Sequence, residues 1–308
     1  MNKLSRRQLL LQAGASSFLL SGLPGFANTE VTAHAPFAAL EQKAGGRLGV
    51  AVLDCAGGAL IGHRWEERFA LCSTFKLPLA GVVLREADQG RLQLDRHLIY
   101  GPADMVPHAP VTSKHLAAGR MSIAALAEAA QTTSDNVAAN LLLRELGGPA
   151  GLTVRLRELG DGETRLDRYE PQMNAVDVVH AGELRDTSTP LAMARTTDRL
   201  LNSDWLAPAS RKRLAQWMIA TDTGLKRLRA GFPAGWTAGD KTGTFTGPGI
   251  ADKLNDVAIA WPLGRSPLIV SAYYESSGQH DRMRDQDQAV LAEVGRLAAA
   301  WWQGRQPR

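Results

Sequence analysis

The stretch Leu48-Gly49-Val50-Ala51-Val52-Leu53-Asp54, together with the ten residues after it, decides the class of fold. Its valines and leucines predict a strand, Ala56-Gly57-Gly58 predicts a turn, and residues 59–64 pair back to complete a hairpin. Three more strands are predicted near the other end of the chain, at residues 237–241, 256–261 and 268–274. Strands therefore lie at both ends of the sequence.

Helical patterns fill the middle of the chain. Apolar residues at helical spacing predict helices at residues 74–88, 122–132, 136–145, 149–159, 190–201 and 208–220, and a last helix at 282–302. The simplest α/β (α+β) arrangement is one antiparallel sheet built from both chain ends and flanked by helices, with an all-helical domain inserted. Residues 28–68 and 221–308 are the predicted α/β domain and residues 69–220 the helical domain. The cleft between them is the predicted site for a ligand.

The composition argues against a nucleic-acid partner and against zinc. The formal net charge is +4, but three of the 35 basic residues and none of the 31 acidic ones lie in the first 27 residues, which leaves 32 bases and 31 acids in the remainder. No basic run is interleaved with aromatic residues. The histidines are scattered and no CxxC occurs, so we expect no metal and no cofactor. We expect Cys55 and Cys72 to be free thiols.

The first 27 residues have the layout of a secretory signal peptide. Ser5-Arg6-Arg7-Gln8-Leu9-Leu10 is followed by an apolar stretch to Leu20, and Gly25-Phe26-Ala27 places small residues at a cleavage site. The paired arginines favour the twin-arginine route. The apolar stretch is too short and too polar for a comfortable membrane anchor. We expect a periplasmic mature protein, monomeric and without stable membrane association.

Three short motifs could carry chemistry, although each alone is more often structural. In Ser73-Thr74-Phe75-Lys76 the serine and lysine share one helix face, so that a lysine with a lowered pKa could take the serine proton. Ser134-Asp135-Asn136 stands between two predicted helices and offers a hydroxyl and an amide. Lys241-Thr242-Gly243-Thr244 ends a predicted strand, and its ammonium and hydroxyls could clamp a carboxylate.

A fourth element lies in residues 166–186, which show no clear period. A loop of this length inside a compact domain is either a misassigned element or a functional loop. It contains Glu170 and Asn174, which could hold a water with Glu170 as general base. The Glu170-Pro171 bond could be cis, and Arg168 and Asp186 could pair to close the loop.

The four elements in this order resemble the class A serine β-lactamases. The resemblance covers nearly all of the mature chain and includes Arg68-Phe69, Pro110-Val111-Thr112 and Asp186-Thr187 with Pro190. It implies a hydrolase that opens the ring of penicillins and cephalosporins, a small-molecule substrate, and antibiotic resistance. The implied roles are nucleophile for Ser73, proton acceptor for Lys76, proton relay for Ser134, and water activation for Glu170 with Asn174. The implied substrate ligands are Asn136, Lys241, Thr242 and Thr244, and the backbone N–H groups of Ser73 and Thr244 would form the oxyanion hole.

The sequence departs from the family pattern at several places. Lys253-Leu254-Asn255 stands where many members carry a carboxylate-binding arginine, and Arg227 lies where some members place a substitute. The loop from Asn174 to Arg185 is a few residues longer than usual, and His108 takes the place of an aromatic that often guards the cleft. Phe245 replaces the cysteine to which class A carbapenemases typically link the residue equivalent to Cys72. These departures concern the range of substrates.

Three alternative functions share part of this pattern. A DD-peptidase (penicillin-binding protein) acting on peptidoglycan has the three serine and lysine motifs, but Glu170 argues against it. A non-catalytic β-lactam sensor would stay acylated. A serine glutaminase shares Ser-x-x-Lys, but the remaining motifs match that family poorly.

Overall fold

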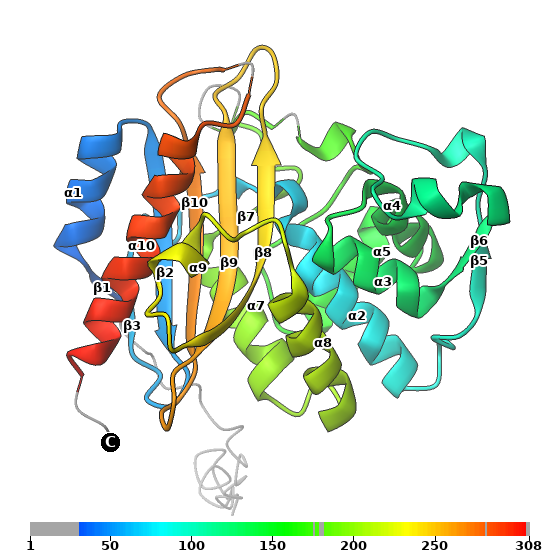
Figure 1. The fold of residues 1–308 in the computed structure, drawn as a ribbon, viewed down its shortest axis with the longest axis horizontal. Coiled ribbons are helices and arrows are strands. Elements are labelled where there is room, and N and C mark those ends of the chain that lie inside the picture. The colour runs from blue at the N-terminus through cyan, green and yellow to red at the C-terminus, as the bar shows by residue number, and fades with distance from the viewer. Residues whose placement is uncertain (1–30, 175, 179–181, 281, 306–308) are drawn as a thin grey trace, which may run out of the picture.

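The computed structural model describes residues 31–174, 176–178, 182–280 and 282–305. Its centre is a six-stranded sheet in the order β1-β3-β2-β10-β9-β8 (Figure 1). The strands are β1 (Val31–Ala33), β2 (Arg47–Asp54), β3 (Leu60–His63), β8 (Thr237–Phe245), β9 (Lys253–Trp261) and β10 (Leu268–Glu275). The prediction of a sheet built from both chain ends is confirmed. All neighbours are antiparallel except β1, which pairs in parallel with β3.

Helices cover both faces of this sheet, and for this reason β2 is a continuous apolar run rather than an alternating one. One face packs against α1 (Ala35–Ala44), α9 (Leu228–Gly231) and α10 (Asp285–Gln303) around a core that includes Val50, Val270 and Trp302. In Figure 1, α10 crosses in front of the strands and α1 lies to its left. The sequence-based prediction missed α1 and β1.

The other face is continuous with the helical part of the molecule, which lies to the right in Figure 1. One hydrophobic cluster runs from Ala51, Ile259 and Tyr273 on the sheet into the helices. The helices are α2 (Lys76–Asp88), α3 (Ile123–Thr132), α4 (Asn136–Glu145), α5 (Gly148–Glu158), α7 (Pro190–Asn202) and α8 (Pro208–Ala220). Helix α7 packs against β2 and β10, and α8 packs against β8. The division into two domains stays a prediction.

Short elements join these parts. Strand β4 (Phe69–Ala70) pairs with β7 (Thr187–Ser188), and β5 (His97–Ile99) pairs with β6 (Arg120–Ser122). The 3₁₀ turns are η1 (Cys72–Phe75), η2 (Pro102–Asp104), η3 (Thr112–Ala118) and η4 (Gln172–Asn174). The predicted signal peptide, residues 1–27, lies outside the described residues. Within the described ranges, no helix is long and apolar enough to cross a membrane.

Several predicted boundaries are wrong by a few residues, and two of them affect the site. The helix predicted from Thr74 begins at Lys76, after the 3₁₀ turn η1. The strand predicted to end at Lys241 continues to Phe245, because β9 begins at Lys253 and pairs with β8 along that whole length. Lys241-Thr242-Gly243 therefore lies inside a strand and not at its end.

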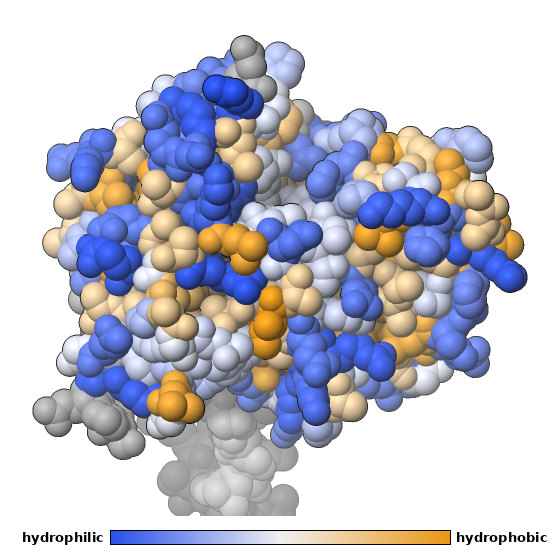
Figure 2. All heavy atoms as spheres, viewed as in Figure 1, coloured by the Kyte–Doolittle hydropathy of each residue, from blue (hydrophilic) through white to orange (hydrophobic). Residues whose placement is uncertain are grey.

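The visible surface is predominantly hydrophilic (Figure 2), with apolar side chains scattered over it in small groups. This is ordinary for a globular protein, in which singly exposed apolar side chains are common. Both cysteines are free, as predicted, Cys72 being buried and Cys55 partly exposed.

Gly49 on β2 provides a test of how tightly the sheet packs against the helical side. A Cβ atom at Gly49 would lie 2.3 Å from the Phe69 ring and 2.9 Å from Pro190 Cγ. We expect Gly49→Ala to lower the free energy of unfolding by about 1–3 kcal/mol, because the ring must shift inside a close-packed core. Urea denaturation measures this. Gly101→Ala is the control, since nothing lies within 4 Å of its Cβ position; an equal loss in both variants would contradict the explanation.

Candidate active site

Ser73 lies in the η1 turn, immediately before α2, with its hydroxyl between a lysine and a glutamate. Lys76 Nζ donates to Ser73 Oγ at 2.9 Å, and Ser73 Oγ donates to Glu170 Oε1 at 3.2 Å. The lysine and glutamate come from segments 94 residues apart in the sequence, yet their Nζ and Oε1 atoms lie 3.1 Å from each other. Both groups that could take the serine proton therefore contact the serine directly.

Lys76 is completely buried, and oxygen atoms surround its amine. Besides Ser73 and Glu170, Nζ donates to Ser134 O at 2.8 Å, Ser134 Oγ at 3.3 Å and Asn136 Oδ1 at 2.5 Å. Burial lowers the pKa of Lys76, and the charge of Glu170 opposes this shift. A buried lysine with a lowered pKa can exist as the neutral amine, which is the form that accepts a proton.

The turn at residues 134–136 places a second hydroxyl between two lysines. Lys241 Nζ donates to Ser134 Oγ at 3.0 Å, and Lys76 Nζ donates to the same oxygen at 3.3 Å. Asp135 fixes this turn, because its carboxylate accepts the N–H groups of Val111 and Thr112 at 3.0 and 2.9 Å and also caps α4. The Ser134 hydroxyl is thus placed to pass protons between the two amines.

Glu170 is held by its backbone as well as by its side chain. Its peptide bond to Pro171 is cis, and Asn174 Nδ2 donates to its Oε2. Asn140 on α4 accepts the Glu170 N–H at 3.0 Å and donates to the Glu170 carbonyl at 2.9 Å. Sequence reasoning missed Asn140; the only available signal was an asparagine one turn beyond Asn136 on the same predicted helix.

The predicted closure of the 166–186 loop by an ion pair is present. Arg168 Nε lies 2.5 Å from Asp186 Oδ2, and Asp186 is fully buried. The other oxygen of Asp186 accepts the N–H groups of Asp167 and Arg168 at 2.7 and 3.0 Å. One carboxylate therefore fixes both ends of the segment that carries Glu170.

Strand β8 forms the opposite wall of the cleft. Lys241 faces Ser134, and Thr242 Oγ1 lies 2.7 Å from Thr223 Oγ1, a residue that sequence reasoning missed. Arg227 is buried beside the strand: Nη2 donates to Thr244 Oγ1 at 2.6 Å, and Nη1 donates to the Gly243 carbonyl at 2.9 Å. The structure thus brings Arg227 to the residues of the predicted carboxylate clamp.

Gly243 permits a close approach between two segments of the chain. A Cβ atom there would lie 2.9 Å from the Leu71 carbonyl oxygen and 3.0 Å from Cys72 Cβ. The segment that approaches Gly243 is thus the protein's own chain leading into Ser73, in addition to any substrate. This contact brings β8 alongside the nucleophile.

These residues line a cavity of about 310 Å³. It collects the predicted residues Ser73, Ser134, Asn136, Asn174, Arg227, Thr242 and Thr244, with His108, Thr223 and Met283 at its sides. A nucleophilic serine, a proton relay and a guanidinium therefore line one space of small-molecule size, and the two candidate bases contact the serine from within the protein.

The comparisons with known proteins identify the family. The model of the β-lactamase enzyme family matches residues 33–302. The chain belongs to this family. It is 42% identical to the carbapenem-hydrolysing β-lactamase KPC of Klebsiella oxytoca over 96% of each chain, and 41% identical to β-lactamase L2 of Stenotrophomonas maltophilia over 96% of this chain and 98% of that protein.

Solved structures agree with this assignment. An ancestral class A β-lactamase is 52% identical with a TM-score of 0.81, and the match covers 87% of this chain and 98% of that one. A β-lactamase from Xanthomonas campestris pv. campestris is 45% identical with a TM-score of 0.79, covering 86% and 96%. The chain thus has the class A β-lactamase fold and is a β-lactam-hydrolysing enzyme.

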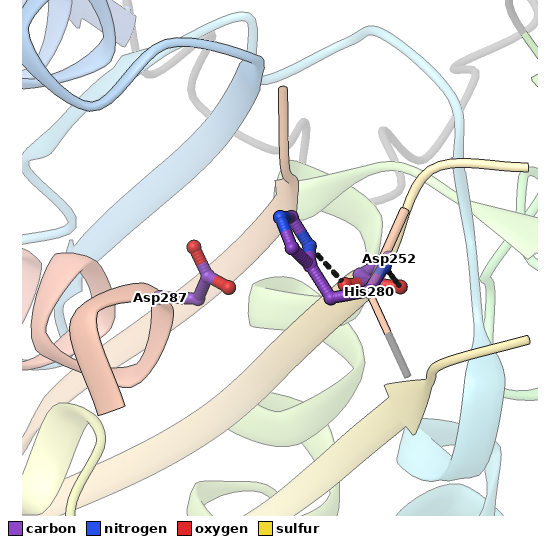
Figure 3. Close-up of side chains that lie close together, drawn as sticks. All are labelled: Asp252, His280 and Asp287. Atoms are coloured by element: carbon purple, nitrogen blue, oxygen red, sulfur yellow. Dashed lines mark hydrogen bonds and ion pairs between the residues drawn. The ribbon is translucent and has the colours of Figure 1, made fainter. Parts of the chain in front are cut away.

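One group of side chains in the described part of this β-lactamase could be considered for a metal ion. Figure 3 shows Asp252, His280 and Asp287, whose ligand atoms lie within 4.8 Å of one another. His280 Nδ1 already bonds to Asp252 Oδ2 at 2.7 Å, and Arg284 binds both oxygens of Asp287 at 2.7 Å. The protein's own groups thus satisfy these carboxylates.

The role of Asp186 leads to a prediction about the 166–186 loop. Asp186→Ala leaves the Arg168 guanidinium and two backbone N–H groups without their acceptor. We expect a loss of about 3–5 kcal/mol in the free energy of unfolding and slower hydrolysis of the acyl-enzyme. Urea denaturation and single-turnover kinetics measure these.

Arg165→Ala is the matched control in the same loop. It breaks the more exposed pair between Arg165 and Asp167, which should contribute at most about 1 kcal/mol. Equal losses in the Asp186 and Arg165 variants would show that the buried carboxylate has no special role.

Proposed function

We propose that this enzyme opens the β-lactam ring of penicillins and cephalosporins through an acyl-enzyme on Ser73. The observation that carries the proposal is the contact of one serine hydroxyl with both Lys76 and Glu170. A serine hydroxyl needs a base to become a nucleophile, and a covalent ester needs a second base to be hydrolysed. This site holds both bases next to the same oxygen.

In the acylation step, the Ser73 hydroxyl proton passes to Lys76 or Glu170 as Oγ attacks the lactam carbonyl carbon. The ring C–N bond then breaks, and the nitrogen takes a proton from Ser134, whose hydroxyl bonds to Lys76 and Lys241. Ser134 regains through Lys76 the proton that left Ser73, so that both bases return to their starting state. The backbone N–H groups of Ser73 and Thr244 are the proposed oxyanion hole. The Asn136 amide is a proposed ligand of the substrate.

In the deacylation step, Glu170 takes a proton from a water held between Glu170 and Asn174. The hydroxide attacks the ester carbonyl, and the Ser73 alkoxide leaves with a proton returned from the protonated base. This step favours a hydrolase over a DD-peptidase or a β-lactam sensor, because the Glu170 carboxylate lies next to the serine.

Lys241, Thr242, Thr244 and Arg227 are the proposed binding site for the substrate carboxylate. Arg227, Thr242 and Thr244 line the cavity, and Lys241 contacts Ser134, which also lines it, at 3.0 Å. A guanidinium paired with hydroxyl groups suits a carboxylate, because charge-assisted hydrogen bonds are the strong ones.

The decisive experiment removes the deacylating base. In Glu170→Ala, we expect the acyl-enzyme to accumulate with a penicillin and to be visible by mass spectrometry, while the wild type turns over. Glu163→Ala is the control, since that carboxylate is exposed and pairs with Arg68. A wild type that also stays acylated would support a sensor, and release of D-alanine from a stem-peptide model would support a DD-peptidase.

We further propose that the protein is exported to the periplasm, is cleaved after Ala27 and works there as a monomer. The support is the layout of the leader and its paired arginines. Replacing Arg6 and Arg7 by lysine should leave uncleaved precursor in the cytoplasm, as measured by cell fractionation and N-terminal sequencing. Undisturbed export of that variant would argue for a route that does not read the arginine pair.

A further inference from the structure

Two buried carboxyl groups lie on the face of the sheet that also carries Thr242, and the proposed reaction uses neither. Asp240 on β8 and Asp256 on β9 are both completely buried. Asp256 is in register with Thr242, and strand alternation places Asp240 on the same face as Thr242. The two aspartates are therefore diagonal neighbours beneath the segment that carries Arg227.

Each carboxyl group has one oxygen with a clear donor. Arg229 Nη1 donates to Asp240 Oδ1 at 3.1 Å, and the Leu228 N–H donates to Asp256 Oδ2 at 3.1 Å. Among the described residues, Asp240 Oδ2 and Asp256 Oδ1 find no donor, and strand register places the two side chains next to each other on one face. Ionised carboxylates only accept hydrogen bonds, so a bond between these two requires a proton.

We propose that Asp240 and Asp256 share one proton at neutral pH and that the protonated pair positions Arg227 for substrate binding. A single proton between Asp240 Oδ2 and Asp256 Oδ1 satisfies both unpartnered oxygens. It also removes the repulsion of two adjacent carboxylates in a buried site.

The electrostatic surroundings agree with this assignment. Burial and the neighbouring Asp240 raise the pKa of Asp256 well above its ordinary value, against the opposing charge of Arg227. Burial also raises the pKa of Asp240, against Arg229 and Lys241. Asp256 is the better candidate for the protonated member, because Asp240 has the ion pair with Arg229.

The two aspartates contact residues that lie before and after Arg227 in the sequence. A Cβ atom at Gly224 would lie 1.6 Å from Asp240 Oδ2, so that residue lies directly on the carboxyl group. Leu228, the residue after Arg227, donates its N–H to Asp256. Arg227 is thus held between two points fixed by the pair, and its Nη2 atom reaches Thr244 from there. Asp240 and Asp256 are positioning residues in this sense.

The pH dependence has a definite sign. In the unfolded chain both aspartates lose their protons near pH 4, whereas the folded pair keeps one. The folded state then binds more protons, so this pair's contribution to stability falls as pH rises from that value through the raised pKa of the folded pair. The amide introduced by Asp256→Asn donates to Asp240 at every pH, so that variant should lack this part of the fall.

Infrared difference spectroscopy tests the proton directly. The spectrum of the wild type minus that of Asp256→Asn at pH 7 should contain the C=O band of a protonated carboxylic acid. Loss of either aspartate leaves the other ionised, so Asp240→Asn should remove the same band. Difference spectra that contain only carboxylate bands would overturn the proposal.

Kinetics test the positioning role, which rests on the proposed binding of substrate carboxylate by Arg227. Asp256→Asn should keep KM within about threefold of the wild type, whereas Asp256→Leu, which fills the space without a polar atom, should raise KM roughly tenfold with a smaller effect on kcat. The KM of the wild type should rise at alkaline pH and that of Asp256→Asn should not.

The infrared test and the kinetic test can fail independently of each other. If no β-lactam is hydrolysed, the proposed function fails and the infrared result still decides whether the proton is shared. If Asp256→Leu does not fold, the infrared spectra and the pH profiles of the wild type and Asp256→Asn decide. An Asp256→Asn variant whose KM rises as much as that of Asp256→Leu would overturn the positioning role.

Discussion

Burial of the Lys76 amine is the constraint on which the rest of the site depends. Removing an isolated ammonium from water costs several kcal/mol, and the amine is completely enclosed. The oxygens that make this tolerable come from Ser73, from the turn at Ser134 and Asn136, and from Glu170. The contacts that stabilise the buried amine therefore also assemble the nucleophile, the proton relay and the deacylating base in one place. Stability and catalysis share one network here, so that none of these segments can move independently.

Much of this site could be predicted from the sequence, because its motifs are local spacings. Ser73 and Lys76 are one helical turn apart whatever the rest of the chain does. What could not be predicted depends on tertiary register: β8 extends past Lys241 only because β9 pairs with it as far as Phe245. Asn140 was missed because it bonds to the backbone of a loop 30 residues away, a contact that leaves no spacing in the sequence. The sheet of both chain ends was predictable, since its apolar runs are continuous.

Successive side chains of strand β8 point to opposite faces of the sheet, and both sets contact residues of the site. Lys241 and Gly243 face the helical side, where Ser134 and the chain leading into the nucleophile lie. Thr242 and Thr244 face the side where Arg227 lies, as shown by the contacts of Thr242 with Thr223 and of Thr244 with Arg227. Strand alternation thus places Lys241 beside the proton relay and its neighbour Thr242 on the side of Arg227, only one residue apart. A shift of register by one residue would turn Lys241 away from Ser134, so the long pairing with β9 has a direct functional consequence.

Strand β9 lacks the carboxylate-binding arginine of many family members, because Leu254 and Asn255 have structural roles there. Leu254 is fully buried in the core beneath α9 and α10, and Asn255 Nδ2 donates to the carbonyls of Ala70 and Leu71 at 2.8 and 3.2 Å, which fixes the chain just before Ser73. An arginine at either position would remove a core contact or a support of the nucleophile. Arg227 reaches the same wall from a neighbouring loop instead, and it donates to the Asn255 carbonyl at 2.8 Å. The position of the Arg227 guanidinium therefore depends on the loop that carries it, and that loop rests on Asp240 and Asp256. For this reason a substitution remote from the substrate can alter the proposed carboxylate-binding site.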